Sequence, residues 1–271
     1  VSLILLVSTL AALGEQVVQA ALPVARPLSM SGNMPAIPHT NQTTHEMTIF
    51  GNGRITSKFL AGEDNLSQVT ANTDKMAFNT IAISFSNMTS SDIGSNDDFV
   101  TITEPFSQAL PLSTGYYEVI TTVYQNKQSP YSYRVTQQTW ATDTCVIMEL
   151  MIENTGMITL EGGQLFFMLD INAGGYNKEF SDKVVSVPEN QLLYHADHLG
   201  NKDGYAMGIS LLSGQLVGYG VASYTEAFTP NQHTVVQAIT SITQTHPPFA
   251  EIDLQDHHNN LVSWLIADIP D

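Results

Sequence analysis

The sequence has little cysteine and little positive charge. Its single cysteine, Cys145, excludes a disulfide bond within the chain and lies in the apolar run Cys145–Met148, which predicts a buried thiol without chemistry. Only 9 Lys and Arg stand against 26 Asp and Glu, so the formal net charge is −17, and the basic residues are not clustered. This balance argues against nucleic acid and anionic membrane surfaces as partners.

Recognisable catalytic motifs are missing as well. No Gly-x-Ser-x-Gly elbow, P-loop, Gly-x-Gly-x-x-Gly or His-Glu-x-x-His motif occurs in the chain. We therefore expect a protein that is not an enzyme. Charged residues amount to 13%, while Ser, Thr, Asn and Gln are abundant, a composition that suits the exposed strand faces of an extracellular protein.

The first 21 residues are mostly apolar. Residues 1–13 form a mostly apolar run, which Gly14 and Glu15 end before the short stretch of residues 17–21. The run is too short for a membrane span and suits the apolar core of a signal peptide cleaved after Ala20. The alternative is a retained apolar helix over 1–21, resembling the assembly helices of pilins, although Leu5 stands where pilins usually carry an acidic residue. Both alternatives predict export, with any membrane contact made through this segment only.

The rest of the chain divides into an arm and one domain. Residues 22–44 are rich in Pro, Ser, Asn and Thr without periodicity, which predicts an extended arm. In residues 45–271, short runs rich in Val, Ile, Thr, Tyr and Phe alternate with turn signals, which predicts a large antiparallel, all-β, two-sheet β-sandwich. The predicted strands are Thr80–Ser86, Phe99–Thr103, Tyr116–Gln125, Tyr131–Trp140, Cys145–Glu153, Gln164–Asp170, Tyr205–Leu211, Leu216–Tyr224, Val235–Thr243 and Leu261–Ala267.

One predicted strand differs in pattern from its neighbours. Leu165–Leu169 is apolar at every position, which predicts a central strand covered on both faces. The Asn-x-Gly sequence Asn154–Gly156 predicts a tight hairpin before it, and residues 125–130 predict another hairpin earlier in the chain. We therefore expect residues 116–170 to form a four-strand meander.

Three runs in this region carry a resemblance to a known family. The runs are Tyr131–Trp140, Val146–Gly156 and Phe166–Asn172, and their turns contain the sequences Asn-Thr-Gly and Leu-Asp. Their strand rhythm and turn placement resemble the large two-sheet supersandwich domains of extracellular polysaccharide-active enzymes. The N-terminal domains of glucodextranase-like glucoamylases are one example, and the resemblance covers roughly residues 116–267. It implies a sandwich fold with a noncatalytic, carbohydrate-facing or surface role, because catalysis in those enzymes belongs to a separate helical barrel.

Two groups of polar residues are candidate metal ligands. Asp170, Asn172 and Asp182 place oxygen ligands after a buried strand, as a calcium site requires, while a Gly-rich turn with capping side chains is the alternative. His195 and His198 have a spacing that zinc accepts, but we interpret the segment after Leu193 as a loop with turn residues. Calcium is therefore the only cofactor that the sequence predicts.

Sequons and aromatic residues are candidate sites for carbohydrate. Asn41, Asn65 and Asn87 begin glycosylation sequons in the N-terminal third. Tyr131, Tyr133 and Trp140 lie on one predicted strand and are candidates for stacking against sugar rings, with packing in the core as the alternative.

These observations give three interpretations of function in order of preference. The first is an extracellular or cell-surface structural protein, a self-assembling subunit of a filament or surface layer, whose copies associate by strand addition at an exposed sheet edge. The second is a carbohydrate-binding accessory domain of a polysaccharide-active system, with polysaccharide as partner. The third is a hydrolase that uses either a metal ion or a pair of carboxylates.

Overall fold

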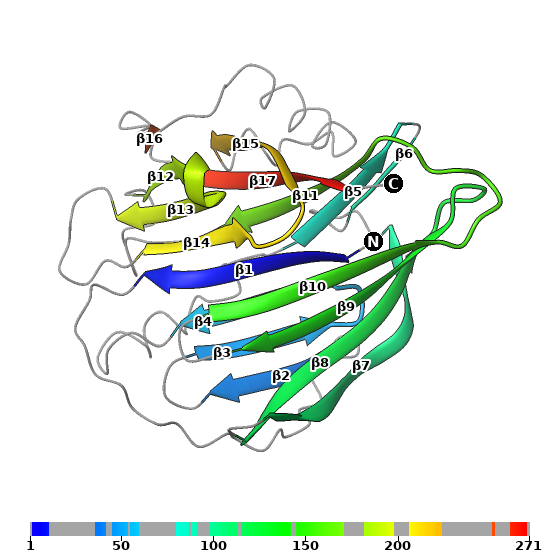
Figure 1. Cartoon of the computed structure of the whole chain (residues 1–271), viewed down its shortest axis with the longest axis horizontal. Coiled ribbons are helices and arrows are strands. Elements are labelled where there is room, and N and C mark those ends of the chain that lie inside the picture. The colour runs from blue at the N-terminus through cyan, green and yellow to red at the C-terminus, as the bar shows by residue number, and fades with distance from the viewer. Residues whose placement is uncertain are drawn as a thin grey trace.

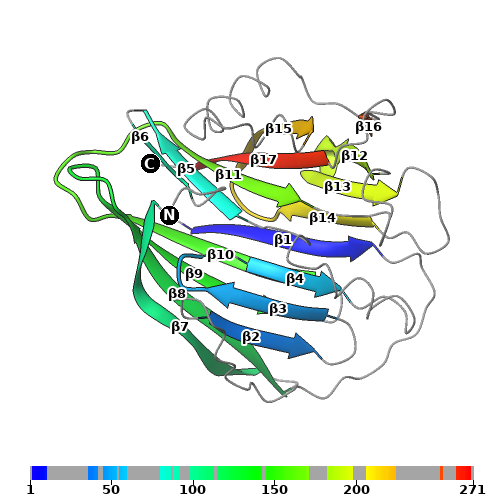
Figure 2. The same cartoon turned by 180° about the vertical axis from the view of Figure 1, so that it is seen from behind.

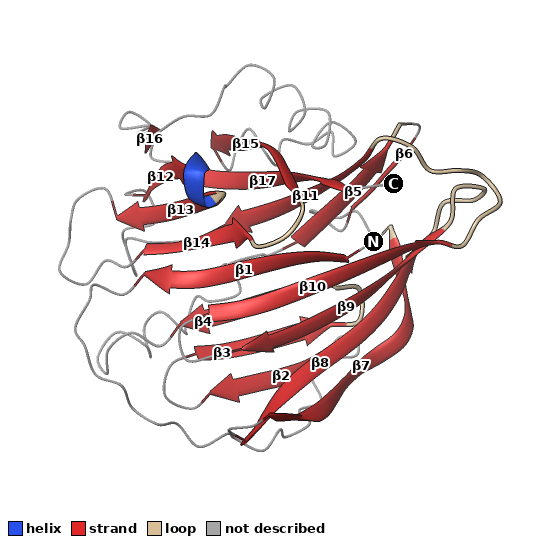
Figure 3. Cartoon of the chain, in the orientation of Figure 1, coloured by secondary structure: helices blue, strands red, loops and turns tan. Residues whose placement is uncertain are grey.

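Strands dominate the part of the chain that the computed structural model describes, which is residues 2–10, 36–41, 45–53, 55–59, 80–86, 88–91, 98–112, 115–141, 145–170, 182–197, 206–223, 251–252 and 261–269. A single 3-10 helix, Pro188–Asn190, interrupts the strands in these ranges (Figure 3). Every strand pairing in them is antiparallel, so the predicted all-β class is confirmed. None of the described residues belongs to a helix that could cross a membrane.

The strands form three sheets (Figure 1). The largest has nine strands in the order β16 (Glu251–Ile252), β12 (Asp182–Val187), β13 (Leu192–Asp197), β14 (Ala206–Leu211), β1 (Ser2–Leu10), β10 (Cys145–Asn154), β9 (Tyr133–Ala141), β8 (Gly115–Asn126) and β7 (Phe99–Leu112). The second has five, in the order β15 (Gln215–Ser223), β17 (Leu261–Ile269), β11 (Gly163–Asp170), β5 (Thr80–Phe85) and β6 (Met88–Ser91). The third has three, in the order β2 (Ala36–Asn41), β3 (His45–Phe50) and β4 (Ile55–Phe59).

The three sheets make two layers. Seen from behind, β2–β4 lie across the part of the nine-stranded sheet that contains β8–β10, and the five-stranded sheet lies toward β12–β14 (Figure 2). One buried core joins the layers, because Leu150 and Ile209 of the nine-stranded sheet cluster with Phe167 of the five-stranded sheet and Ile55 of the three-stranded sheet. The predicted sandwich is therefore present, with its second layer divided between two sheets.

Strand β11 occupies the central position that its sequence predicts. It lies between β17 and β5, and Leu165 and Phe167 belong to the core between the layers. Phe166 and Met168 alternate with them and therefore face the other way, yet they are equally buried. Both faces of β11 are covered, which is why the strand contains no polar position between Leu165 and Leu169.

The predicted four-strand meander is wrong in its last step. Strands β8, β9 and β10 are consecutive neighbours, as expected, but β11 lies in the other layer. The Asn-x-Gly turn does form, since the Gly156 amide donates to Asn154 Oδ1 at 2.9 Å. The Thr155 amide also donates to the Ser132 carbonyl, which anchors the link between layers to the start of β9. Turn residues specify that a chain reverses but not the sheet that it enters next.

Two predictions near the N-terminus also need correction. Ser2–Leu10 is strand β1 between β10 and β14, rather than the first half of an apolar helix over 1–21. Leu, Ile and Val suit a strand as well as a helix, and pairing on both sides satisfies the backbone of β1. Ala36–Asn41 pairs with β3, so the end of the predicted arm over 22–44 belongs to a sheet. Residues 11–35 and the predicted strand Val235–Thr243 lie outside the described residues.

The turn between β3 and β4 packs against β8 through a glycine. Gly53 has a φ of 86°, and a Cβ atom built on it would lie 2.4 Å from Cζ of Tyr124. The Tyr124 hydroxyl donates to Gln137 Oε1 at 3.1 Å, while its ring packs edge-to-face on Phe99 at a centroid distance of 5.2 Å. Thr122 Oγ1 donates to the Gly51 carbonyl at 3.2 Å, so the turn and β8 are joined by hydrogen bonding as well as by close packing.

Candidate functional site

His195 and Ser263 form a hydrogen-bonded pair between the two layers. His195 lies on β13 and Ser263 on β17, and His195 Nε2 is 2.6 Å from Ser263 Oγ. Both side chains are completely buried. Burial lowers the pKa of His195 to about 3, because the charged imidazolium loses its hydration there. The imidazole is therefore neutral at physiological pH.

This pair has the residue types of a nucleophile and its base, but its environment favours a structural role. A catalytic serine must reach a substrate, whereas neither side chain has solvent exposure. His195 Nδ1 is buried without a hydrogen-bond partner among the described residues, so no third group there orients the ring. Sequence reasoning placed His195 at the start of a loop. The signal it missed is alternation, since Leu193 and His195 both occupy core-facing positions of β13.

The predicted calcium ligands are only partly described. Asp170 ends β11 in the five-stranded sheet and Asp182 begins β12 in the nine-stranded sheet, so both lie at strand ends. Asn172 and the side chains of both aspartates lie outside the described residues. Among the side chains that the structure does describe, no group of three His, Cys, Asp or Glu could hold a metal ion. The calcium site stays a prediction.

The predicted sequons lie mostly outside the described ranges. Asn41 is the last residue of β2, and Asn65 and Asn87 are not described. Glycosylation at these asparagines stays a prediction.

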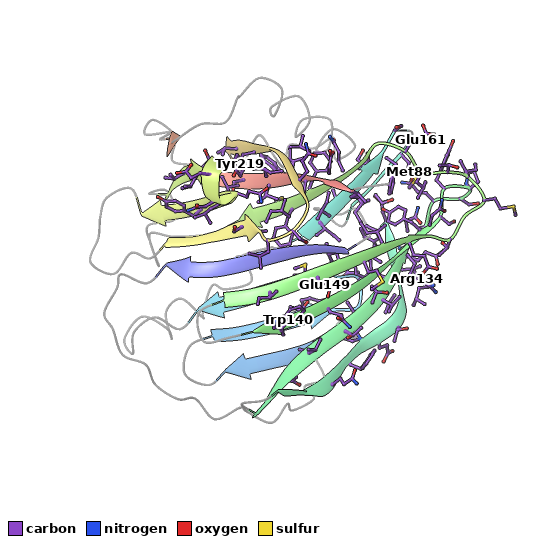
Figure 4. All side chains as sticks on the ribbon, viewed as in Figure 1. Met88, Arg134, Trp140, Glu149, Glu161 and Tyr219 are labelled. Carbon is purple, nitrogen blue, oxygen red and sulfur yellow. The ribbon has the colours of Figure 1, made fainter. Side chains whose placement is uncertain are left out.

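The three predicted stacking residues do not share a surface. Tyr133 is completely buried, and its ring packs edge-to-face on Phe85 at a centroid distance of 5.4 Å. Tyr131 is half-buried and packs against the same core. Trp140 is partly exposed at the far end of β9 (Figure 4). The prediction for Tyr133 is therefore corrected: its ring is part of the core and presents no face to a sugar.

Strand β7 forms one outer edge of the nine-stranded sheet as described. It extends from Phe99 to Leu112, well beyond the predicted Phe99–Thr103, and β8 is its single partner among the strands that the structure describes. Val100, Ile102 and Phe106 are 42%, 51% and 44% exposed. Its register shifts between Thr101 and Phe106, which marks irregular pairing near the middle of the strand. The sequence shows that this strand contains apolar residues, but it does not show that the strand lies at the edge of a sheet.

Comparison with known proteins adds no family to this description. The chain matches no protein-family model and no curated protein.

Proposed function

We propose that this protein is an extracellular or cell-surface structural protein whose copies associate through their β-strands to build a filament or surface layer. The observation that carries the proposal is the edge strand β7 with its exposed apolar side chains. An edge strand offers backbone N–H and C=O groups to another strand, and apolar side chains beside them add burial when a second strand pairs there. A second copy of the same edge satisfies both requirements in an antiparallel, two-fold arrangement that joins copies in pairs, and a filament or layer needs a further contact between these pairs.

Charge supports a second copy as the occupant of this edge. The chain carries a formal net charge of −17, which makes copies repel one another over most of their surface. Glu104 is the only charged residue of β7. Copies that approach through β7 therefore bring one acidic side chain of this strand each to the contact.

This proposal predicts that a charge on β7 prevents assembly. Ile102→Lys should raise the dissociation constant for self-association at least tenfold, because pairing would bury the ammonium group. The matched control is Leu212→Lys, since Leu212 is 50% exposed in the turn after β14 and Ile102 is 51% exposed. Sedimentation velocity over a concentration series, with electron microscopy of the same samples, measures the difference. Equal association of both variants would remove β7 as the interface, and a wild-type protein that stays monomeric throughout would overturn the proposed function.

The same proposal predicts a dependence on salt. Raising NaCl from 0.05 to 0.5 M shortens the Debye length from roughly 14 Å to roughly 4 Å, which screens the repulsion between acidic copies. Association should therefore strengthen with salt, as measured by the midpoint concentration in light scattering. Weaker association at high salt would indicate an interface held by opposite charges and would contradict apolar strand pairing.

A carbohydrate-binding accessory role is the second candidate. It is favoured by Trp140, which is partly exposed on β9, while Arg134 and Glu149 lie on the same pair of strands (Figure 4). Isothermal titration against a panel of polysaccharides, with Trp140→Ala as the comparison, tests this role. Binding that is lost in the variant would support it, and flat isotherms for the wild type would remove it.

A further inference from the structure

Strand β1 completes the nine-stranded sheet from far away in the sequence. It pairs with β10 from Ser2 opposite Met151 to Ser8 opposite Cys145, and with β14 from Leu5 opposite Leu211 to Leu10 opposite Ala206. Both pairings are antiparallel, and β1 lies inside the sheet rather than at an edge (Figure 1). Without β1, strands β10 and β14 would each present an unpaired edge in the middle of the molecule.

The positions along β1 match the gap between β10 and β14. Leu3, Leu5 and Val7 stand at every second position of the strand. Their register partners include Leu150, Met148 and Ile209, which are all buried in the core between the layers. Directly opposite residues of antiparallel strands share a face, so these positions of β1 belong to the core-facing side of the sheet. β1 also contains no charged residue, proline or glycine.

None of these pairings depends on which copy of the chain supplies β1. The register partners on β10 and β14 are the same for a strand from a neighbour, so an exchanged strand keeps every backbone hydrogen bond and every core-facing position. A copy whose β1 has left exposes two adjacent edges that another β1 fits. The free energy of exchange is then set by chain entropy and by new contacts between copies, not by the sheet itself.

We propose that residues 1–21 are retained in the mature protein rather than cleaved as a signal peptide, and that β1 links copies of this protein: each copy inserts its β1 between β10 and β14 of the next. The inference rests on the proposed function, of which it is the linking step, and the edge strand β7 provides a separate contact beside it. Residues 11–35 separate β1 from β2 in the sequence, and a segment of this length spans on the order of 80 Å when fully extended. That reach is sufficient for β1 to enter a neighbouring molecule.

Donation in one direction also gives the assembly a polarity. If copy one receives β1 from copy two, the β1 of copy one is free to enter copy three, so the contact is heterologous. The chain of copies then grows as a filament, unless the rotation between successive copies closes it into a ring. A reciprocal exchange between two copies would instead close into a dimer. The partner in both cases is a second copy of this chain.

The lone cysteine makes a direct test possible. Ser8 and Cys145 are register partners, so Ser8→Cys introduces a thiol opposite the native one. Opposed residues of antiparallel strands have Cα atoms about 4.5 or 5.5 Å apart, both within the range that a disulfide spans. Equal amounts of ¹⁴N-labelled and ¹⁵N-labelled full-length chains of this variant are mixed in denaturant, refolded together, assembled, oxidised mildly and digested. Mass spectrometry then identifies peptides that join position 8 to Cys145.

The labels distinguish the two origins of β1. Exchange predicts that about half of the joined peptides contain one light and one heavy partner, since donors are drawn at random. A strand retained in its own chain predicts joined peptides of a single label only. The controls are the wild type, in which Cys145 pairs only with itself, and Ser8→Cys in a Cys145→Ser background.

Each outcome decides the inference separately from the proposed function. Assemblies visible by electron microscopy with single-label peptides would overturn strand exchange and leave self-association intact. Failure to assemble would overturn both. Val7→Cys with Val146→Cys, in a Cys145→Ser background, tests the adjacent register pair, which has the other of the two antiparallel spacings. Absence of a disulfide at both pairs would overturn the register on which the inference depends.

Discussion

Replacing Gly53 with alanine is expected to lower the free energy of unfolding by about 3 kcal/mol. A Cβ atom at this position would lie 2.4 Å from the ring of Tyr124, which is far inside van der Waals contact. The ring has little freedom to move, because Phe99 packs against it and its hydroxyl is bonded to Gln137. Crowding of this kind costs about 1–3 kcal/mol, and a φ of 86° adds about 1–2 kcal/mol for a residue with a Cβ atom. Urea denaturation followed by circular dichroism measures the loss.

Gly214→Ala is the matched control for this variant. Gly214 has a φ of 105° and is exposed, so alanine there experiences backbone strain without the clash on Tyr124. The difference between the two variants isolates the contact with the ring. A double-mutant cycle gives a second check, since Gly53→Ala should cost less in a Tyr124→Leu background. Equal destabilisation by both alanines would contradict the docking of the β3–β4 turn onto β8.

Local sequence pattern was sufficient for strands β8–β11 but not for their neighbours, and it did not identify β1–β4, β12 or β13 as strands. The unbroken apolar run Leu165–Leu169 predicts a strand with two covered faces, and β11 has this environment between β17 and β5. The sequence could not place β11 in the second layer, because the choice between sheets depends on strands that are distant in the chain. The same reason applies to β1, whose partners β10 and β14 begin at residues 145 and 206. An apolar stretch without visible partners is compatible with a helix, a signal segment or a strand.

The error at Tyr133 was avoidable from the sequence. Side chains alternate between the two faces of a strand, so residues separated by an odd number of positions face opposite ways. Tyr133 and Trp140 are separated by seven positions on β9 and could not form one stacking surface in a regular strand. The sequence did not show whether Tyr133 or Trp140 points into the core. Val135, Gln137 and Thr139 share the buried side of β9 with Tyr133, and only Val135 among these three is strongly apolar.

The buried imidazole of His195 should make the protein sensitive to mild acid. The pKa of His195 is lowered to about 3 in the folded protein, whereas a histidine in the unfolded chain titrates near 6.5. Below pH 6.5 the unfolded state binds a proton that the folded state cannot accept, so this group's contribution to stability is complete above pH 6.5 and is lost as the pH falls toward 3. From pH 7 to pH 5 the linkage amounts to about 2 kcal/mol.

Two variants separate this effect from the titration of the many carboxylates. His195→Gln removes the titration while keeping an amide that can hydrogen-bond Ser263, so its stability should fall about 2 kcal/mol less than that of the wild type between pH 7 and pH 5. Ser263→Ala keeps the buried imidazole and removes its partner, so it should lower stability by about 1–3 kcal/mol at pH 7 while retaining the wild-type pH dependence. Urea midpoints at each pH give the comparison. Parallel curves for the wild type and His195→Gln would show that His195 accepts a proton in the folded protein as readily as in the unfolded chain, which would contradict its depressed pKa.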